Sequence, residues 1–401
     1  MNGSGIVNGS GDGSGRGDES AAGRPGDATG GEPGGGRKYF VTGGAGYVGS
    51  VVAAHLLDAG HRVTVLDDLS TGHREAVPAG AEFIEGRVQD LTSPAGEGRL
   101  DGSYDGVLHF AAFSQVGESV ADPEKYWRNN VGGTMELLAA MRAAGVRRLV
   151  FSSTAATYGD PESVPIAETD ATAPTSPYGA SKLAVDHMIG GECAAHGLAA
   201  VSLRYFNVAG AHRSAGGSLH GELHDPESHL IPLVLQVALG RREAVSVYGD
   251  DYPTPDGTCV RDYIHVSDLA EAHLLALDGA APGEHLICNL GNGNGFSVRE
   301  VIETVRRVTG HPVPENAAPR RPGDPAVLVA SAERARNRLG WKPARPGLAD
   351  IVRDAWEFAL GRNGGAQKAS AENGTPENGT PQNGTYGNRT AEHESGRTAE
   401  A

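Results

Sequence analysis

The stretch "KYFVTGGAGYVGSVVAAHLLDAG", residues 38–60, decides the fold class of this chain. A short apolar run comes first, a glycine-rich turn follows, and a longer run with helical spacing of its apolar residues completes the stretch. Strand, turn and helix in that order begin an open α/β sheet, in which parallel strands alternate with helices. The stretch therefore predicts a doubly wound parallel sheet.

Three glycines spaced three apart, Gly43, Gly46 and Gly49, occupy the turn. Gly43 permits the tight turn, Gly46 lets the backbone approach a pyrophosphate, and Gly49 lets the helix pack closely on the strand. The start of the helix, at Tyr47 and Val48, adds N–H groups and the positive end of the helix dipole. In a chain with 59 glycines the triplet alone is also compatible with a plain tight turn. The strand before it and the helix after it favour phosphate binding.

Asp67 and Asp68 end the next predicted strand, about 20 residues beyond the glycines, where dinucleotide-binding folds carry an acidic residue. A carboxylate there accepts hydrogen bonds from both hydroxyls of an adenosine ribose and repels a 2′-phosphate. The alternative is a turn or helix-capping role within "DDLSTG". We therefore expect NAD rather than NADP as the cofactor.

The alternation of strands and helices continues to residue 207 and then breaks down into shorter elements. Strands are predicted at 38–43, 62–68, 81–86, 106–112, 147–153 and 198–207, and helices at 47–60, 123–145 and 178–196. The pattern predicts a Rossmann-type NAD-binding domain over 37–207 and a smaller C-terminal lobe. We expect this lobe, 208–361, to bind mainly substrate and to return in part to the sheet.

Both ends of the chain are polar and of low complexity, which predicts disordered tails over 1–36 and 362–401. The formal net charge of −16 disfavours a nucleic-acid surface and a polybasic membrane patch. No apolar run reaches the roughly 20 residues of a membrane span, and the N-terminus lacks a signal-peptide pattern. We expect a soluble, cytoplasmic protein without membrane attachment.

Three scattered cysteines, Cys193, Cys259 and Cys288, lack both a disulfide framework and the spacing of metal ligands. We expect them to be small buried side chains, and we expect no bound metal.

The segment "TSPYGASKLAVDH", residues 175–187, places Tyr178 and Lys182 one helical turn apart on the same face. An ammonium beside a phenol favours the phenolate, although lowering a pKa from about 10 to about 7 takes about 4 kcal/mol. Lys182 and a cationic nicotinamide together could supply that, which would make Tyr178 a general base. A solvated helix pair is the ordinary alternative, but Ser152, Ser153 and Thr154 end a central strand at the sheet edge where ligands bind.

These motifs together resemble the extended short-chain dehydrogenases/reductases, and the chain from 38 to 361 is similar to the UDP-glucose 4-epimerases among them. The resemblance is carried, in order, by "TGGAGYVG", "VGES", "NNVGGT", "SPYGASK", "LRYFNVAGAH", "HLIP", "YGDDYPTPDGTCVRDYIHVSDLA" and "RRPGD". It implies an isomerase of galactose and nucleotide-sugar metabolism that keeps NAD tightly bound. Such enzymes oxidise C4 of a UDP-hexose to a transient ketone and return the hydride to the other face.

By resemblance, Tyr178 is the catalytic base, Lys182 its electrostatic partner and ribose anchor, and Thr154 the hydroxyl that assists proton transfer. Further cofactor contacts implied by the resemblance are Phe110, Ala111, Asn130, Ser153 and Tyr205. Substrate contacts so implied, besides Thr154 and Tyr178, are Asn207, His229, Leu230, Arg261, Tyr263, Arg321, Asp324 and Val327. His265 is expected to be a packed histidine at the start of a helix.

Three positions depart from the pattern of the family. Arg87 stands where an aspartate commonly contacts adenine, and Ser114 replaces a lysine found in some members. Val327 replaces a bulky tyrosine of glucose-restricted members, three positions after Asp324. The smaller side chain suggests room for a 2-acetamido group, so UDP-GlcNAc and UDP-GalNAc are possible further substrates.

Alternative functions on the same fold are a sugar-nucleotide 4,6-dehydratase, a UDP-glucuronate epimerase and a non-catalytic NAD-binding scaffold. Dehydratases resemble one another in an Asp-Glu pair after the strand-end threonine, where this chain has Ala155 and Ala156. The sequence does not locate extra positive charge for a glucuronate, and a scaffold does not need the tyrosine and lysine. The resemblance also implies a homodimer that pairs the helices around 122–143 and 178–196 across a two-fold axis.

Overall fold

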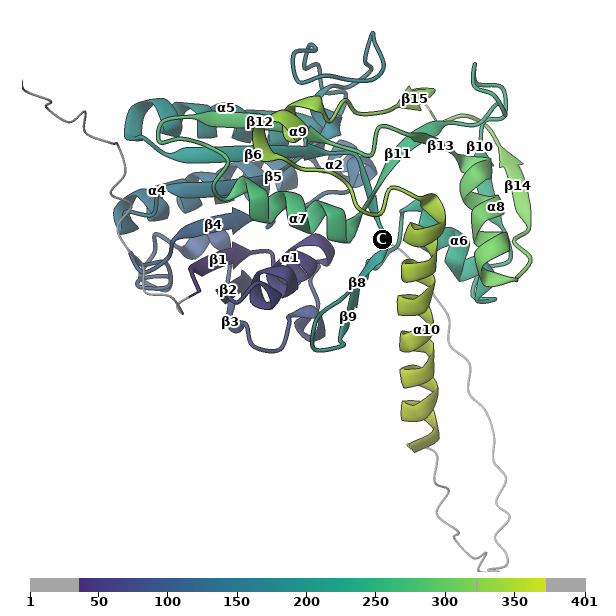
Figure 1. Ribbon diagram of the computed structural model, residues 1–401, viewed down its shortest axis with the longest axis horizontal. Coiled ribbons are helices and arrows are strands. Elements are labelled where there is room, and N and C mark those ends of the chain that lie inside the picture. The colour runs from purple at the N-terminus through teal and green to yellow at the C-terminus, as the bar shows by residue number, and fades with distance from the viewer. Residues whose placement is uncertain (1–35, 322–323, 373–401) are drawn as a thin grey trace, which may run out of the picture. The chain divides into compact units, whose positions relative to one another are not determined.

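A seven-stranded parallel sheet forms the centre of the fold, with strand order β12-β6-β5-β4-β1-β2-β3 (Figure 1). The structure is a computed structural model that describes residues 36–321 and 324–372. The strands are β1 (Lys38–Thr42), β2 (Arg62–Asp67), β3 (Glu82–Glu85), β4 (Gly106–His109), β5 (Arg148–Thr154), β6 (Ala199–Tyr205) and β12 (His285–Leu290). Every neighbouring pair in this sheet is parallel. The predicted doubly wound, Rossmann-type sheet is therefore confirmed.

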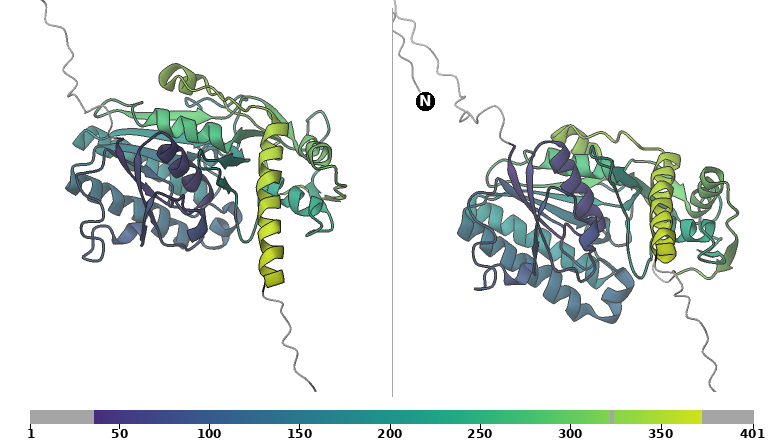
Figure 2. Two further views of the ribbon diagram at one scale, coloured as in Figure 1. Left: turned by 60° about the horizontal axis from the view of Figure 1, so that its bottom comes forward. Right: turned by 90° about the horizontal axis from the view of Figure 1, so that it is seen from below.

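Helices cover both faces of the sheet, as the two views in Figure 2 show. One face carries α1 (Tyr47–Asp58) and α7 (Val266–Ala276), and the other carries α4 (Gly133–Ala144) and α5 (Pro177–His196). Because the inner strands are buried on both faces, their central residues are mostly apolar, as a parallel sheet requires, whereas the edge strand β3 is partly exposed. This explains why short continuous apolar runs identified the strands in the sequence.

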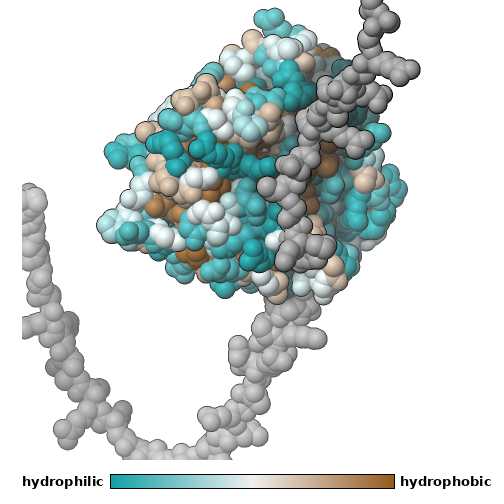
Figure 3. Space-filling model, turned by 60° about the vertical axis from the view of Figure 1, so that its left-hand side comes forward, coloured by the Kyte–Doolittle hydropathy of each residue, from teal (hydrophilic) through white to brown (hydrophobic). Residues whose placement is uncertain are grey.

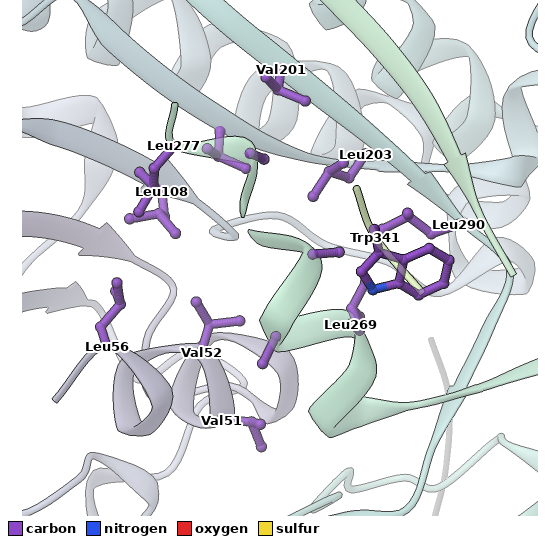
Figure 4. Packing of buried hydrophobic residues seen from close by; sticks show 14 of the residues in the cluster. Val51, Val52, Leu56, Leu108, Val201, Leu203, Leu269, Leu277, Leu290 and Trp341 are labelled. Atoms are coloured by element: carbon purple, nitrogen blue, oxygen red, sulfur yellow. The ribbon is translucent and has the colours of Figure 1, made fainter. Parts of the chain in front are cut away.

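The core beneath α1 and α7 is shown in Figure 4, where apolar side chains of both helices meet those of the central strands. Trp341 closes this cluster at the end of the sheet, next to Leu269 and Leu290. Its side chain is fully buried, and its indole N–H donates to the backbone oxygen of Asp268 at 2.8 Å. The hydrogen bond satisfies the one polar atom of this large side chain.

The second half of the chain builds a smaller lobe from short strands and three helices (Figure 1). Its strands are β7 (Asn207–Ala209), β8 (Ala211–Arg213), β9 (Leu219–Gly221), β10 (Val245–Tyr248), β11 (Val260–His265), β13 (Gly295–Ser297), β14 (Glu315–Ala318) and β15 (Val327–Leu328). Its helices are α6 (Leu230–Ala238), α8 (Val298–Thr309) and α10 (Leu348–Glu372), which share a separate apolar cluster. β12, α7 and α9 (Glu333–Leu339) return to the large sheet.

The helix predicted over 123–145 is interrupted, which the sequence pattern did not indicate. α2 (Val116–Ala121) and α3 (Pro123–Tyr126) precede a π-helical turn at Trp127–Gly132, and α4 follows. The extra residue of a π-turn rotates the following side chains, and such turns are frequent at functional sites. Short 3₁₀ turns lie at Arg74–Ala76, Val88–Asp90 and Ala155–Thr157.

The last helix differs from the expectation for the C-terminal end of the chain. α10 runs to Glu372, so residues 362–372, which composition assigned to the tail, continue it. The sequence there contains Ala, Gln, Lys and Glu, which favour helix and offset the glycines. The rest of both predicted tails, 1–35 and 373–401, lies outside the described residues.

The three cysteines are buried and free, as the sequence predicted. Among residues 36–321 and 324–372, no helix is both long enough and apolar enough to span a membrane.

Candidate active site

The glycine turn between β1 and α1 has the geometry of a phosphate cradle. Gly43 has φ +73°, and a Cβ there would lie 2.5 Å from the backbone nitrogen of Ala111. A Cβ at Gly49 would lie 2.2 Å from the oxygen of Gly43, so the close packing of helix on strand excludes any side chain. A Cβ at Gly46 would meet only that same oxygen, at 3.4 Å. The protein thus has room for a side chain at Gly46, and its glycine leaves that space free for a ligand.

A cleft that is partly open to solvent begins at this turn. Six of the predicted cofactor contacts line it, namely Gly43, Gly46, Asp67, Asp68, Phe110 and Ala111. Tyr47, Val48 and Gly49 lie beside it in the first turn of α1, where helix N–H groups have no partner within the helix. The Tyr47 side chain points away, and its hydroxyl donates to the oxygen of Gly210 at 2.7 Å.

Asp67 lies in the cleft and is only 8% exposed. Burial raises the pKa of its carboxyl, and two backbone donors oppose this, the N–H of Leu69 and of Ala45, each at 2.9 Å. Each carboxylate oxygen keeps a second lone pair for a ligand hydroxyl. Anion-binding N–H groups at one end and a ribose acceptor at the other fit a dinucleotide such as NAD.

Tyr178 and Lys182 lie in the first turns of α5, at the carboxyl edge of the sheet. Ser176 caps the helix by accepting from the N–H of Gly179 at 3.2 Å, and Pro177 occupies its first turn. Tyr178 is partly buried, whereas Lys182 is 3% exposed. The Lys182 ammonium donates to the backbone oxygen of Ser152 at 2.9 Å, and so links α5 to the end of β5.

The electrostatics of this pair differ from the simplest form of the prediction. Burial raises the pKa of the Tyr178 phenol, and a hydrogen bond with Thr154 opposes the rise. Burial also lowers the pKa of Lys182 to about 8, against the attraction of Asp186. Burial thus leaves the pKa of the Tyr178 phenol raised in the protein alone, and the lowered pKa stays a prediction that requires the positive charge of a bound nicotinamide.

Ser152, Ser153, Thr154 and Tyr205 meet at the ends of the adjacent strands β5 and β6, where Thr154 pairs in register with Tyr205. The hydroxyls of Ser152 and Tyr205 hydrogen-bond to each other. Ser153 donates to Asp186 at 3.3 Å and is 1% exposed. Thr154, at 9%, is the most exposed of the three strand-end hydroxyls.

Asn130 links the cleft to the tyrosine helix through the π-turn. Its side-chain oxygen accepts from the N–H of Phe113 at 2.9 Å, and its nitrogen donates to the oxygen of Phe113 at 3.0 Å and to Ser181 at 3.1 Å. Asn130 thus fixes Phe113, which lines the cleft. The neighbouring Asn129, rather than Asn130, lines the cleft itself.

Several cleft residues carried no signal in the sequence. They are Ser70, Thr71, Gly72, Gln89, Ala112 and Phe113, whereas Asn129 belongs to the quoted segment "NNVGGT" but was not among the expected contacts. Most lie in loops that follow β2, β3 and β4, so the rule that ligands bind at the carboxyl ends of strands could have identified the loops but not the residues. Of the two departures near the cofactor, Arg87 lines the cleft and is exposed, while Ser114 is exposed outside it.

The predicted substrate residues of the smaller lobe gather around β11. Arg261 and Tyr263 alternate along the strand and so share a face, and Asn207 on β7 pairs in register with Tyr263. Arg261 forms an ion pair with Asp324. Tyr263 is 5% exposed within the apolar cluster of the lobe, so most of its ring supports the strand from inside.

The remaining predicted substrate residues lie on neighbouring elements. His229 and Leu230 begin α6, Val327 pairs with Val260 between β15 and β11, and the Arg321 guanidinium lies 4.0 Å from the ring centre of Tyr248. His265 caps α7, with its Nδ1 accepting from the N–H of Ser267 at 3.0 Å. The expectation of a packed histidine at a helix start is confirmed.

Comparisons with known proteins agree with this geometry. Residues 39–291 match the model of the NAD dependent epimerase/dehydratase family. A UDP-glucose 4-epimerase of Streptomyces lividans is 74% identical over 323 residues, which are 80% of this chain and 95% of that protein. The crystal structure of UDP-glucose 4-epimerase from Brucella ovis in complex with NAD is similar with a TM-score of 0.74 and 44% identity, over 80% of this chain and 98% of that one.

The structure of the UDP-Glc/GlcNAc 4-epimerase from Campylobacter jejuni is similar with a TM-score of 0.71 and 37% identity, over 81% of this chain and all (100%) of that one. The family model covers more than half of the chain, and these relatives are similar over nearly their whole length. The chain therefore belongs to the NAD dependent epimerase/dehydratase family.

Proposed function

We propose that this chain is an isomerase that interconverts UDP-galactose and UDP-glucose by epimerisation at C4, with NAD as a tightly bound and recycled cofactor. The observation that carries the proposal is that Tyr178, Lys182 and Thr154 lie at the carboxyl edge of the same sheet whose first turn, at Gly43 and Gly46, lines the cleft. The Streptomyces lividans relative, named a UDP-glucose 4-epimerase, supports the substrate class.

In the proposed reaction, the phenol oxygen of Tyr178 takes the proton of the C4 hydroxyl while the hydride leaves C4. When bound, NAD would supply the acceptor for this hydride and, after the transient 4-keto sugar has turned, its donor. Thr154, whose hydroxyl opposes the rise in the pKa of the Tyr178 phenol, shares the proton with the sugar oxygen. Lys182 holds positive charge beside the phenolate and anchors the nicotinamide ribose. Tyr178 returns the proton at the end, so that no net oxidation occurs.

A sugar that must turn over between two hydride transfers has to be held by its UDP end. We assign this to the smaller lobe, with Arg261 and Arg321 on the pyrophosphate and Asp324 on the uridine ribose. The Arg261–Asp324 ion pair keeps the two groups in place between turnovers. Asn207, His229, Leu230 and Tyr263 complete the proposed pocket. This division assigns cofactor binding to 37–207 and mainly substrate binding to 208–361.

One product-resolved assay tests the function. Purified protein is incubated with UDP-galactose without added NAD, and the products are separated and quantified. We expect an equilibrium mixture with UDP-glucose, from either direction. Formation of a 4-keto-6-deoxy sugar would instead indicate a dehydratase, which the alanines after Thr154 disfavour. Absence of any conversion by protein that holds NAD would indicate a scaffold.

We also propose that the acetamido pair, UDP-GlcNAc and UDP-GalNAc, is accepted. Val327 on β15 is only partly buried and is smaller than the tyrosine of glucose-restricted relatives. The Campylobacter jejuni neighbour is named a UDP-Glc/GlcNAc 4-epimerase. Steady-state assays with both pairs decide the point, and Val327→Tyr is expected to lose the acetamido activity selectively. Normal turnover of UDP-galactose with none of UDP-GalNAc would disprove this extension.

A cytoplasmic homodimer is the proposed form of the enzyme. Among the residues whose burial the structure describes, seven large apolar side chains are exposed, and four of them, Val116, Val120, Trp127 and Met135, lie on the helical segment from α2 to α4. Figure 3 looks onto the side that carries α4 in Figure 1 and shows hydrophobic areas separated by hydrophilic ones. An interface that includes this side would therefore mix apolar and polar contacts, as many protein interfaces do.

A further inference from the structure

A second group of ligating side chains lies in the loop between β9 and α6 (Figure 1), apart from the proposed catalytic residues. Glu222, His224, Glu227 and His229 each direct one nitrogen or oxygen to a common point, and these atoms all lie within 4.8 Å of one another. We propose that these four residues, the 222–229 cluster, bind a divalent transition-metal cation such as Zn²⁺.

The spacing of the ligand atoms is close to what a four-coordinate cation needs. Zn²⁺ lies roughly 2.0–2.2 Å from nitrogen and oxygen ligands, so tetrahedral ligand atoms lie roughly 3.4 Å apart. His224 Nδ1 is 3.0 Å from Glu222 Oε1 and 3.9 Å from Glu227 Oε1. His229 Nδ1 is 3.9 Å from Glu227 Oε1 and pairs directly with Glu222. These separations bracket the required value, and because the four atoms lie within 4.8 Å of one another, binding would require Glu222 and His229 to move apart and wider pairs to draw together.

Burial and charge also favour a cation at this point. The side chains of Glu222 and Glu227 are 6% and 7% exposed, and buried carboxylates require compensation of their charge. The cluster has no net charge when both imidazoles are protonated beside the two carboxylates. It also has no net charge when both imidazoles are neutral and one divalent cation is bound. A cation can therefore replace two protons without changing the charge of the cluster. His229 is 52% exposed, which leaves a path for entry.

The ligand set indicates the class of metal. Two imidazoles and two carboxylates suit zinc and its divalent neighbours, whereas Mg²⁺ and Ca²⁺ prefer oxygen ligands alone. Glu227 is held by backbone groups, because its carboxylate accepts from the N–H of Ser228 at 2.7 Å and of His229 at 2.8 Å. Such outer contacts orient metal ligands. From the sequence, we expected no bound metal because the cysteines lack the spacing of metal ligands. That expectation did not consider a site built from histidine and glutamate side chains.

The position of the cluster gives the cation a structural role. His229 is the N-cap residue of α6, and the backbone oxygen of Leu223 hydrogen-bonds His73 at 3.1 Å. The ring of His224 packs edge-on to Tyr47, at 6.5 Å between centres. A bound cation would therefore fasten the segment that joins the start of α1 to the start of α6.

The test uses the full, NAD-loaded chain without a histidine tag, dialysed against a chelator and then titrated with Co²⁺. We expect about one equivalent to bind, with the intense visible absorption of a tetrahedral nitrogen and oxygen site. His224→Ala and Glu227→Gln should each weaken Co²⁺ binding by more than the roughly 10–100-fold that loss of an outer contact costs. The matched control His196→Ala removes an exposed histidine elsewhere and should bind Co²⁺ as the unaltered chain does.

The proposal would be overturned if the unaltered chain failed to bind Co²⁺, or if both variants bound it as tightly as the unaltered chain does. The cluster would then be a set of ion pairs. X-ray absorption of the Zn²⁺-loaded unaltered chain provides a measurement that does not depend on variants. Two imidazoles in a shell at roughly 2.0 Å support the site, and sulfur ligands or no imidazole reject it. Conversion of UDP-galactose plays no part in either readout, so the proposed function and this site can fail separately.

Discussion

At the scale of single residues, the proposed chemistry depends most on the phenol of Tyr178. Replacement by Phe keeps the ring between Tyr126 and the end of β5 but removes the proton acceptor. Loss of a general base typically costs about 10²–10⁴ in rate, so we expect kcat of Tyr178→Phe to fall by about that much. NAD content, measured after denaturation of the purified variant, should stay at that of the unaltered enzyme. Near-normal turnover would remove Tyr178 from the mechanism.

We expect the activity to fall at alkaline pH, because Lys182 is buried and loses its charge there. Burial lowers the pKa of its ammonium to about 8, so the group is charged below that pH and neutral above it. Because the neutral amine no longer favours the phenolate, we expect kcat/KM to fall as pH rises through about 8. The variant Lys182→Arg keeps its charge at all these pH values and should lose this alkaline fall, at a lower overall rate. The same fall in both proteins would assign it to another group.

At the scale of elements, the glycine turn offers a matched pair of substitutions. Gly46→Ala fits the protein, because its Cβ would approach only the oxygen of Gly43 at 3.4 Å, and Gly46 already has φ −81°. We expect this variant to fold with little loss of stability but to lose NAD, since the methyl group would occupy the space proposed for the pyrophosphate. Gly49→Ala would place a Cβ 2.2 Å from the same oxygen and should destabilise the packing of α1 on β1.

Thermal unfolding of both variants, with and without NAD, separates the two effects. Without NAD, we expect Gly46→Ala to melt at a temperature close to that of the unaltered protein without NAD. When NAD is added, the melting temperature of Gly46→Ala should rise less than that of the unaltered protein. An unfolded Gly46→Ala, or NAD binding equal to that of the unaltered chain, would contradict it.

Elements of the sheet could be predicted because each apolar run of a buried parallel strand is short and continuous, as in "RVTVLD" of β2. The interruption of the helix at Trp127–Gly132 could not, because a π-turn is set by tertiary contacts. There, Asn130 must reach both Phe113 and Ser181, which lie 17 and 51 residues away in the chain. A periodic pattern reports the local helix and carries no information on those partners.

In the site, too, the sequence predicted residues with a local signal but not those that depend on distant partners. Gly43, Gly46 and Asp67 have roles that follow from local geometry and spacing, and the structure places all three in one cleft. Gln89 and Asn129 also line it and hydrogen-bond each other at 2.9 Å, but Gln89 lies in no motif, and the motif "NNVGGT" that contains Asn129 did not single it out as a contact. Their contribution depends on how loops after different strands meet, which the sequence leaves open.

At the scale of the whole molecule, a buried ion pair connects the tyrosine helix to the sheet. Arg204 on β6 donates to Asp186 on α5 at 2.9 and 3.0 Å, and both side chains are at most 5% exposed. Arg204 also donates to Tyr158 at 3.1 Å, whose hydroxyl donates to Asn289 on β12 at 2.7 Å. Three elements from distant parts of the chain thus share one polar network.

We expect Arg204→Met to lower the free energy of unfolding by about 3–5 kcal/mol, because it leaves Asp186 buried without its partner. The double variant Asp186→Leu with Arg204→Met should be more stable than Arg204→Met alone, since it no longer buries the Asp186 carboxylate without its arginine. Urea unfolding of the NAD-loaded proteins measures both. The exposed pair Arg128–Glu124 is the control, and its removal should cost no more than about 1 kcal/mol. Equal costs for the buried and exposed pairs would show that the network does not stabilise the fold.

The proposed dimer should cover apolar side chains that are exposed in a single chain. Val120 is 65% exposed and Met135 56%, although both are large apolar side chains on helices next to the site. A second copy of the chain that covers them would remove apolar area from water, which stabilises the dimer by about 25 cal/mol per Å² buried. Sedimentation should therefore give twice the chain mass of 41.4 kDa at micromolar concentration, and Val120→Glu with Met135→Glu should shift the mass toward one chain. Leu360→Glu, on α10 and 44% exposed, introduces the same charge elsewhere and should leave the dimer intact. A single-chain mass for the unaltered protein would exclude the dimer, and an unchanged mass for the double variant would place its interface on another face.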